Sequence, residues 1–245
     1  MFEVLRGIPQ GSILGPLIFN IFINDIFFFI EKSEICNFAD NDTLYLCERN
    51  LLRIKENLTL DMKHILLWFR TKSLKANAGK FQFMILNRKN HRRQRMAINS
   101  ITVKESNEVI LLGKTIDNKL VFKKYIENLC RTAQYKLHAL TRIRKYLNLD
   151  KVVLLGNTFI NSRFNYAPLI WMFSRKTLYH KIEKIHHRTL KVIYQSEESY
   201  ENLLLESSSV SIHQRHPRFL VTEIYKSTTQ INPEFMWPYF TYITT

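Results

Sequence analysis

The chain has 245 residues, is 46% hydrophobic and carries a formal net charge of +15. Its hydrophobic content is sufficient for a sizeable core and excludes a largely disordered protein, while only 6 glycines and 6 prolines exclude a fibrous or linker-rich one. Three widely spaced cysteines, Cys36, Cys47 and Cys130, lack the spacing of a metal site and suit a reducing compartment, so we expect an intracellular protein.

The charge is unevenly distributed along the chain. Residues 1–50 have a net charge of −4, whereas residues 51–120 have +10 and residues 121–245 have +9. A polyanion is the natural partner of so basic a surface, and nucleic acid is the commonest polyanion. On composition alone, a basic protein whose charges are merely solvated remains the alternative.

The N-terminal part begins with a loop and a long apolar run. Two glycines and a proline between Arg6 and Ser12 predict the loop, and Ser12 is placed to cap the helix that follows. The apolar residues of 13–30 predict a thick helix, but Asn24 and Asp25 interrupt them, so the run falls short of the roughly 20 residues of a membrane span. We therefore expect a buried helix and no membrane partner.

Residues 35–47 read ICNFADNDTLYLC, two short apolar stretches around a polar centre of Asp40, Asn41 and Asp42. Asn and Asp tolerate the left-handed backbone of a tight turn, so the pattern predicts a β-hairpin. The two carboxylates allow two interpretations. They are either ordinary turn residues or oxygen ligands for Mg²⁺ that the flanking strands hold rigidly.

Helical and strand patterns alternate after the hairpin. Apolar residues at helical spacing cover 51–74, and a short strand is expected at 80–86. Further strands are expected at 98–103 and 109–113, paired with each other across a polar turn.

Beyond residue 122 the pattern is helical throughout. The expected helices are 122–147, 150–172, 176–194 and 213–229. We therefore predict an α+β fold with a boundary near residue 120, which separates a strand-bearing part at 1–120 from an all-helical part at 121–245.

Two segments near the N-terminus resemble the reverse transcriptases of non-LTR retrotransposons. RGIPQGSILGPLIFNIFINDI, at 6–26, matches that family's Pro-Gln-Gly-Ser loop and apolar helix, and NFADNDTLY, at 37–45, is similar to its aromatic-Ala-Asp-Asp hairpin. The resemblance extends over essentially the whole chain. Its further segments are 68–69, 74–77, 80–81, 111–113, 159–173 and 210–216.

The resemblance implies a partial polymerase palm, with antiparallel strands and packed helices, at 1–120. It implies a helical thumb-like or connector-like region at 121–245. The implied activity is RNA-directed DNA synthesis from dNTPs, on an RNA template and a DNA primer, by two-metal nucleotidyl transfer with Mg²⁺. A functional enzyme of this kind is expected in the nucleus.

The hairpin carries the residues that the resemblance assigns to catalysis. Asp40 matches a catalytic acid that binds the metal ions. The family has a second Asp in the next position, whereas this chain has Asn41 there and its second catalytic candidate at Asp42. Asp42 is displaced by one residue step, roughly 3.3 Å along a strand, and points to the other side. We therefore expect Mg²⁺ binding to be weak or absent.

The resemblance also implies an inactive polymerase. The family's other metal-binding carboxylate comes from a strand before the Pro-Gln-Gly loop, and that loop lies close to Met1. Asp25 and Glu34 are the nearest acids, outside the family's context. We expect no polymerase activity unless an upstream polymerase fragment supplies the missing part. The alternatives are a non-catalytic RNA- or DNA-binding remnant and a translated relic without a role.

Supporting roles are implied for several other residues. Lys80 matches a catalytic lysine near the leaving pyrophosphate, although an ordinary surface lysine is equally consistent with its position. Leu112 and Gly113 match a hairpin that supports the primer end, and Lys114 adds a possible phosphate contact. The residues matched to the substrate-binding loop are Gln10, Gly11 and Ser12.

Basic residues after position 121 are candidates for binding the template–primer backbone. Such contacts would be sequence-independent and sensitive to salt. The implied nucleic-acid-binding residues are Lys123, Lys124, Arg131, Arg142, Arg144 and Lys145. Four histidines, His186, His187, His213 and His216, form no metal motif, and we expect them to be satisfied or at the surface.

Overall fold

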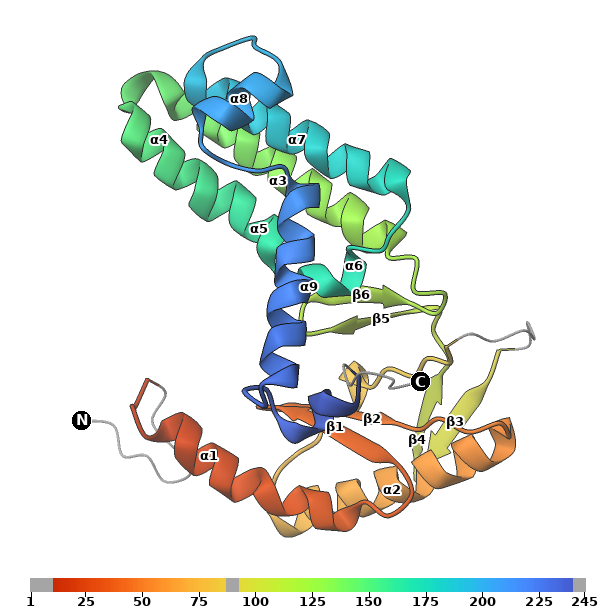
Figure 1. Ribbon diagram of the computed structural model, residues 1–245. Helices are drawn as coiled ribbons and strands as arrows, with labels where there is room; N and C mark the ends of the chain where they lie inside the picture. Colours follow the sequence, from red (N-terminus) through yellow and green to blue (C-terminus); the bar gives the residue numbers. More distant parts are fainter. Residues whose placement is uncertain (1–10, 87–92, 240–245) are drawn as a thin grey trace. The chain divides into compact units, whose positions relative to one another are not determined.

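The computed structural model describes residues 11–86 and 93–239 (Figure 1). The chain divides into two compact units, Met1–Gly113 and Lys114–Thr245. Short antiparallel strands and helices make up the first unit, and the second is mainly helical, which confirms the α+β class. Within the described ranges no helix is both long and apolar enough to cross a membrane.

The apolar run near the N-terminus forms helix α1 (Gly15–Ile23) and the 3₁₀ helix η1 (Asn24–Phe29). The predicted cap by Ser12 is wrong because α1 begins later, where Pro16 fits the first turn without a backbone N–H. The prediction of a buried helix is also wrong, since Ile23 is the one buried residue of α1. The exposed apolar side chains of α1 are Leu17, Ile18, Ile21 and Phe22.

The predicted hairpin is present as β1 (Glu34–Phe38) and β2 (Asn41–Tyr45), which pair antiparallel. Helix α2 (Leu51–Thr71) follows and begins after Asn50, whose side chain accepts hydrogen bonds from two backbone N–H groups of the first turn. One face of the hairpin packs with α2 on a small core. That core contains Ile23, Ile26, Ile65 and Trp68, with Ile35 and Leu44 of the hairpin against it.

The strand expected at 80–86 is wrong. The 3₁₀ helix η2 (Ala78–Lys80) occupies its start, and within 80–86 the sheet-like pairing is a single bridge from Phe83 to Glu105. The Gln82 side chain instead bonds the backbone of Ile110, accepting from its N–H at 2.8 Å and donating to its C=O at 3.1 Å. A side chain therefore replaces the expected strand ladder.

The strand expected at 98–103 is also wrong, because the chain turns inside it. Strand β3 (Arg95–Ile98) pairs antiparallel with β4 (Ile101–Lys104), and Asn99 in the turn has a φ of +52°. Asn tolerates this left-handed backbone, so the turn follows ordinary chemistry. Strand β5 (Glu108–Leu111) lies where a strand was expected at 109–113.

The turn after β5 has left-handed backbone at two successive residues, with φ of +47° at Leu112 and +76° at Gly113. Glycine adopts this conformation readily, and leucine does so only at a cost. The two compact units divide at this turn, a few residues before the boundary predicted near residue 120.

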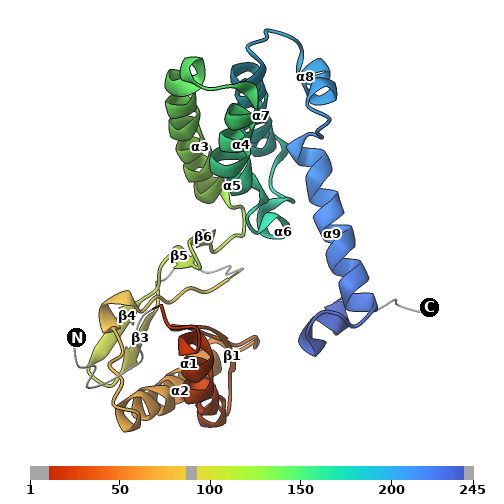
Figure 2. The same cartoon turned by 90° about the vertical axis from the view of Figure 1, so that its left-hand side faces the viewer.

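Helices α3 (Lys123–Ile143), α4 (Leu149–Gly156) and α7 (Lys176–Tyr194) pack side by side in the second unit (Figures 1 and 2). Their apolar faces form one core, with Ile126, Ala133, Val152 and Ile182 fully buried. The remaining elements are β6 (Lys114–Asp117), the 3₁₀ helix η3 (Arg144–Tyr146), the π-helix η4 (Asn157–Asn161), α5 (Ser162–Asn165), α6 (Pro168–Trp171), α8 (Tyr200–Glu206), α9 (Ile212–Thr228) and the 3₁₀ helix η5 (Glu234–Tyr239).

The expected helices agree with α3, α7 and α9 within a few residues, but the one expected at 150–172 is interrupted. Ala167, with φ of +47°, breaks it before α6. Pro168 is the reason, because a proline disfavours helical backbone in the residue before it.

A buried polar chain joins α7 to α8 and α9. The Arg215 guanidinium donates to Nε2 of His186 at 3.2 Å, and Nδ1 of His186 contacts the Tyr200 hydroxyl at 2.6 Å. The Tyr200 hydroxyl donates to Glu183, whose carboxylate also accepts the backbone N–H of His213 at 2.7 Å. These contacts confirm the expectation of a satisfied histidine for His186.

Candidate active-site hairpin and basic surface

The hairpin tip lies one residue earlier than its polar centre indicates. Phe38 pairs with Asn41, so Ala39 and Asp40 form the two-residue turn and Asp42 belongs to strand β2. Ala39 supplies the left-handed backbone with a φ of +52°. Asp40 is exposed, and the amide of Asn41 donates to its carboxylate at 3.2 Å.

Asn41 and Asp42 occupy opposite faces of the hairpin. Successive strand residues alternate between faces, and Asp42 is paired in register with Asn37. The Asn37 side chain donates to the Asp42 carboxylate at 2.5 Å and to the Ala39 carbonyl at 3.1 Å. The Asp42 side is the inner face of the hairpin, shared with Ile35 and Leu44, and it carries an ordered amide–carboxylate pair. Asn41 lies on the outer face, and both Asn41 and Asp42 are exposed.

The Asp42 carboxyl is more easily protonated than an ordinary one. The surrounding hairpin partly desolvates this carboxyl, although the residue is exposed, and this desolvation, together with the nearby Asp40 charge, raises its pKa. The hydrogen bond from Asn37 acts in the opposite direction but does not cancel the shift. A cation bound beside Asp42 would offset the repulsion that the Asp40 charge exerts on the Asp42 carboxylate.

The hairpin alone does not complete a metal site. In residues 11–86 and 93–239, no three His, Cys, Asp or Glu side chains gather closely enough to hold an ion. Asp25 accepts from the Trp68 indole at 3.0 Å and pairs with Lys72 at 2.7 Å. Glu34 accepts from the Tyr45 hydroxyl at 2.5 Å. Both acids therefore serve the fold near the hairpin.

Asp61 holds the segment that leads into β1. Its buried carboxylate accepts from the backbone N–H groups of Glu31, Lys32 and Ser33 at 2.6–3.2 Å, and from the Ser33 hydroxyl at 2.6 Å. Burial alone would raise the pKa of Asp61, but the hydrogen bonds together lower it. Sequence reasoning missed this residue, although Asp61 interrupts the apolar stripe of α2 between Leu58 and Ile65.

The other catalytic and substrate candidates are not gathered at the hairpin. Lys80 is exposed at the end of η2, and among the described residues no hydrogen bond or ion pair joins it to Asp40. Gln10 lies outside the described residues. Gly11 has a φ of +86°, and a Cβ there would meet nothing within 4 Å. The Ser12 hydroxyl is buried and has no partner among the described residues.

Lys114, predicted as a possible phosphate contact, is instead buried. Its ammonium donates to the Tyr125 hydroxyl and, at 3.1 Å, to the Tyr166 carbonyl. It lies 3.6 Å from the Tyr166 ring centroid, a cation–π contact. Burial lowers its pKa to about 8. The residue after the Leu112–Gly113 turn therefore anchors β6 to α3.

The basic candidates of the second unit have different environments. Lys123 and Lys124 lie exposed in the first turn of α3, where the helix dipole disfavours positive charge. Arg131 and Arg142 are exposed on α3, and Lys145 lies 4.9 Å from the Tyr146 ring.

Arg144 is a structural residue. Its Nε donates to the carbonyls of Val192 and Ile193 at 3.2 and 3.1 Å, and its Nη1 donates to the Leu147 carbonyl at 3.1 Å. These carbonyls lie in the last turn of α7 and just after η3, where a helix leaves its acceptors unpaired. Arg144 is therefore not available to a phosphate in the way the sequence predicts.

Comparisons with known proteins identify relatives over most of the chain. Residues 2–116 match the family described as reverse transcriptase (RNA-dependent DNA polymerase). The chain is 22% identical, over 200 residues, to the RNA-directed DNA polymerase from mobile element jockey of Drosophila melanogaster. It is 22% identical, over 201 residues, to the probable RNA-directed DNA polymerase from transposon X-element of the same species. Both alignments cover 78% of this chain and 22% of the relative.

The jockey polymerase of Drosophila funebris is 24% identical over 197 residues, which are 76% of this chain and 22% of that protein. The chain thus spans about a fifth of the length of the curated relatives it matches. No solved structure matches it.

Proposed function

Residues 2–116 of this chain belong to the reverse transcriptase family, and from that premise we propose that the chain is a segment of the RNA-directed DNA polymerase of a non-LTR retrotransposon. The names of the curated relatives support the proposal, because all three are RNA-directed DNA polymerases of mobile elements or transposons. The proposed substrates are dNTPs, the proposed partners are an RNA template and a DNA primer, and the proposed location is the nucleus.

The hairpin tip carries the proposal. Asp40 is exposed in a two-residue turn between paired strands, where the sequence matches the family's metal-binding acid. Asp42 follows on the inner face, with a raised pKa that a nearby cation would lower again. We assign Asp40 the metal-binding role and Asp42 a supporting one, while the neutral amide of Asn41 lies on the outer face.

The described residues do not by themselves fit a pair of Mg²⁺ ions. Two-metal catalysis uses carboxylates that bridge both ions and so activate the primer 3′-oxygen and stabilise the leaving pyrophosphate. The hairpin tip offers two carboxylates, Asp40 and Asp42, and Asp42 already accepts a hydrogen bond from Asn37. Within the described residues no third ligand lies close enough to complete an ion site. The hairpin alone therefore does not make up a two-metal site, and we propose it as one part of such a site.

Ion binding by the hairpin is tested by NMR with Mn²⁺, a paramagnetic substitute for Mg²⁺. Addition of Mn²⁺ is expected to broaden the backbone amide signals of residues 39–43 before those of other segments. Asp40→Asn should remove this selectivity, and Asn37→Asp, which adds a carboxylate opposite Asp42, should increase it. Equal broadening along the whole chain, or no change in Asp40→Asn, would overturn the assignment of Asp40.

Primer extension tests the polymerase role. The chain is combined with an upstream polymerase fragment of the family, an RNA template, a DNA primer, dNTPs and Mg²⁺. Asp40→Asn is expected to lower the rate of primer extension at least about tenfold, because the metal site loses a carboxylate. The double variant Asn41→Asp/Asp42→Asn, which restores the family order, should extend faster than wild type. Unchanged extension in Asp40→Asn would contradict the proposal.

A second candidate function is non-catalytic binding of RNA or DNA by the helical unit. It is favoured by Lys123 and Lys124 in the first turn of α3, where a bound phosphate would relieve an unfavourable arrangement of charges. Binding of an RNA–DNA duplex without any extension, weakening steeply as salt rises, is the expected observation. Affinity that does not depend on salt would contradict this mode.

A further inference from the structure

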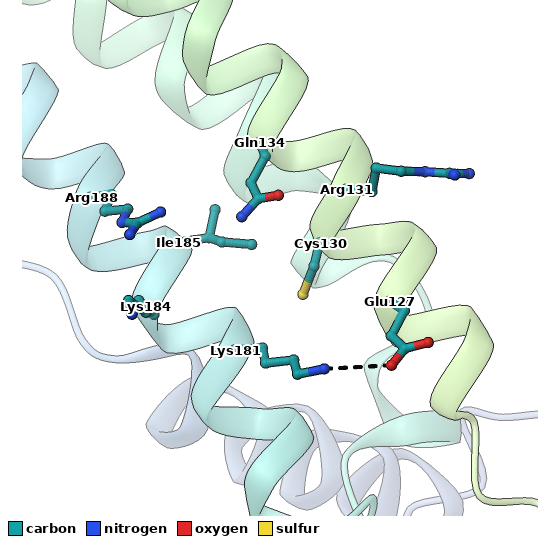
Figure 3. Close-up of a pocket in the computed structure, with 8 residues that line it drawn as sticks. All are labelled: Glu127, Cys130, Arg131, Gln134, Lys181, Lys184, Ile185 and Arg188. Atoms are coloured by element: carbon teal, nitrogen blue, oxygen red, sulfur yellow. Dashed lines mark hydrogen bonds and ion pairs between the residues drawn. The ribbon is translucent and has the colours of Figure 1, made fainter.

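A groove runs between helices α3 and α7 on the surface of the helical unit (Figure 3). Its volume is about 420 Å³. The residues that line it are Glu127, Cys130, Arg131, Gln134, Lys181, Lys184, Ile185 and Arg188. Four of these side chains are cationic and one is acidic. Apart from Arg131, none of the four cations carried a predicted role.

The positive charge is concentrated at one end of the groove. At the other end Glu127 pairs with Lys181 at 3.4 Å, so these two charges offset each other. Lys184 and Arg188 are exposed and have no acidic partner among the described residues. In Figure 3 the Arg188 and Gln134 side chains extend toward each other across the groove, while Arg131 extends outward from α3. An anion at this end would meet cations on one side and an amide donor on the other.

The cations of α7 form a row. Lys181, Lys184 and Arg188 are separated by three and four residues, which places them on one face of the helix. At 1.5 Å per residue the row is about 10 Å long. Charges in a row suit a linear polyanion, whereas a single phosphate is usually held by donors that converge on one point.

The floor of the groove is apolar. Cys130 and Ile185 are buried there, 7% and 2% exposed. Burial raises the pKa of the Cys130 thiol to about 11, so the floor carries no thiolate that would repel an anion. Such a floor suits the apolar face of a sugar or base, while the rim holds the backbone.

We propose that this groove binds the phosphodiester backbone of a nucleic-acid strand, with Lys184 and Arg188 as the principal phosphate contacts and Gln134 as a neutral donor. Lys181 and Arg131 contribute charge at the rim. The inference deepens the proposed function, on which the choice of nucleic acid as the polyanion rests. It assigns the contacts mainly to α7, whereas the sequence pointed to α3 and the residues after it.

The test is fluorescence anisotropy of the full chain with a labelled single-stranded RNA, and in a separate arm with an RNA–DNA duplex of the same sequence. The key variant is Lys184→Gln/Arg188→Gln. Its matched control is Lys151→Gln/Arg175→Gln, which removes the same charge from exposed residues outside the groove. Thermal unfolding checks that all variants are folded.

The expected effect follows from counterion release. Each phosphate contact on a single strand contributes about 0.7 to the slope of log affinity against log salt. Loss of two contacts should therefore lower the slope by about 1.4 and the affinity about 25-fold at about 0.1 M salt. The charge-retaining variant Lys184→Arg/Arg188→Lys should keep the wild-type slope, and the control double variant should stay within about twofold of wild type.

Several results would overturn the inference. One is a control variant whose affinity falls as much as that of the groove variant. The others are an unchanged salt slope in the groove variant and a wild-type chain that binds neither the strand nor the duplex at low salt. Inorganic phosphate at millimolar concentration should compete weakly, and strong competition would mean a site for a single anion. The assay requires no catalysis, so a failed primer extension with intact groove binding overturns the polymerase proposal alone.

Discussion

Acidification should destabilise the helical unit through two buried histidines. His186 accepts a hydrogen bond from Arg215 at Nε2, so its proton lies on Nδ1 toward Tyr200. A second proton on His186 would sit on Nε2 and place its N–H against the Arg215 guanidinium. His216 is similar, since Nε2 donates to the Phe164 carbonyl at 3.3 Å and Nδ1 contacts the Tyr179 hydroxyl. Both rings are therefore held neutral in the folded chain.

The magnitude follows from the pKa values. Burial, aided by the Arg215 and His187 charges, lowers the pKa of His186 to about 3. Burial likewise lowers the pKa of His216 to about 4, despite the opposing bond to Phe164. The unfolded chain takes up protons below about pH 6.5 and the folded chain does not, so stability falls as the pH drops below that value. At pH 5 each histidine lowers the free energy of unfolding by about 2 kcal/mol relative to pH 7.

The assay is urea unfolding followed by circular dichroism at pH 7 and at pH 5. The wild-type chain should lose about 4 kcal/mol of unfolding free energy between the two, and His186→Gln should lose about 2 kcal/mol less than wild type over the same interval. His138→Gln, an exposed histidine on α3, is the control for loss of an imidazole and should retain the wild-type difference. An equal pH effect in wild type and His186→Gln would refute the reasoning.

Three further substitutions have definite expected effects on the free energy of unfolding, measured by urea titration. Asp61→Asn should lower it by about 2–3 kcal/mol, because it replaces an acceptor of four hydrogen bonds with a group that is half donor; Ser33→Ala should have a smaller effect. Arg144→Met should lower it by about 1–3 kcal/mol, since three carbonyls lose their donor, and should leave the salt slope of oligonucleotide binding unchanged. Ala39→Val should lower it by about 1–2 kcal/mol because of the left-handed backbone, while Ala39→Gly should not. The explanation for Asp61 would be contradicted if Asp61→Asn were as stable as wild type. The explanation for Arg144 would be contradicted by a weaker salt slope in Arg144→Met, and the explanation for Ala39 by equal stability of its two variants.

The family resemblance read from the sequence is confirmed by the match of residues 2–116 and by the curated relatives. Helices α3 and α7 were predictable because their apolar periodicity is long and uninterrupted. The hairpin was predictable because its turn residues separate two apolar stretches. Its register was not, since Ala39 supplies the left-handed backbone that the pattern assigned to the Asp and Asn beside it.

The failures have a common physical origin in tertiary contacts. Local pattern predicts a strand at 80–86, but the side chain of Gln82 takes the backbone contact that a ladder would need. The local sequence pattern also cannot distinguish a basic residue that is available to bind phosphate from one that serves the fold. Arg144 is bonded to the end of α7, and Lys114 lies between two tyrosines. The groove combines residues more than 40 positions apart on α3 and α7, so no local reading of the sequence could assemble it.

The π-helix Asn157–Asn161 makes the length of this segment as important as its composition. A π-turn contains one residue more than the α-turn it replaces, and each residue of an α-helix rotates the chain by about 100°. Deletion of Thr158 would remove this extra residue and allow the segment from α4 to α5 to close into a regular α-helix, with Phe164 still facing the core and its carbonyl still near His216. In the uninterrupted helix α3, by contrast, a missing residue would turn every following side chain by about 100°. A single missing codon should therefore be less harmful to the helical unit here than in α3.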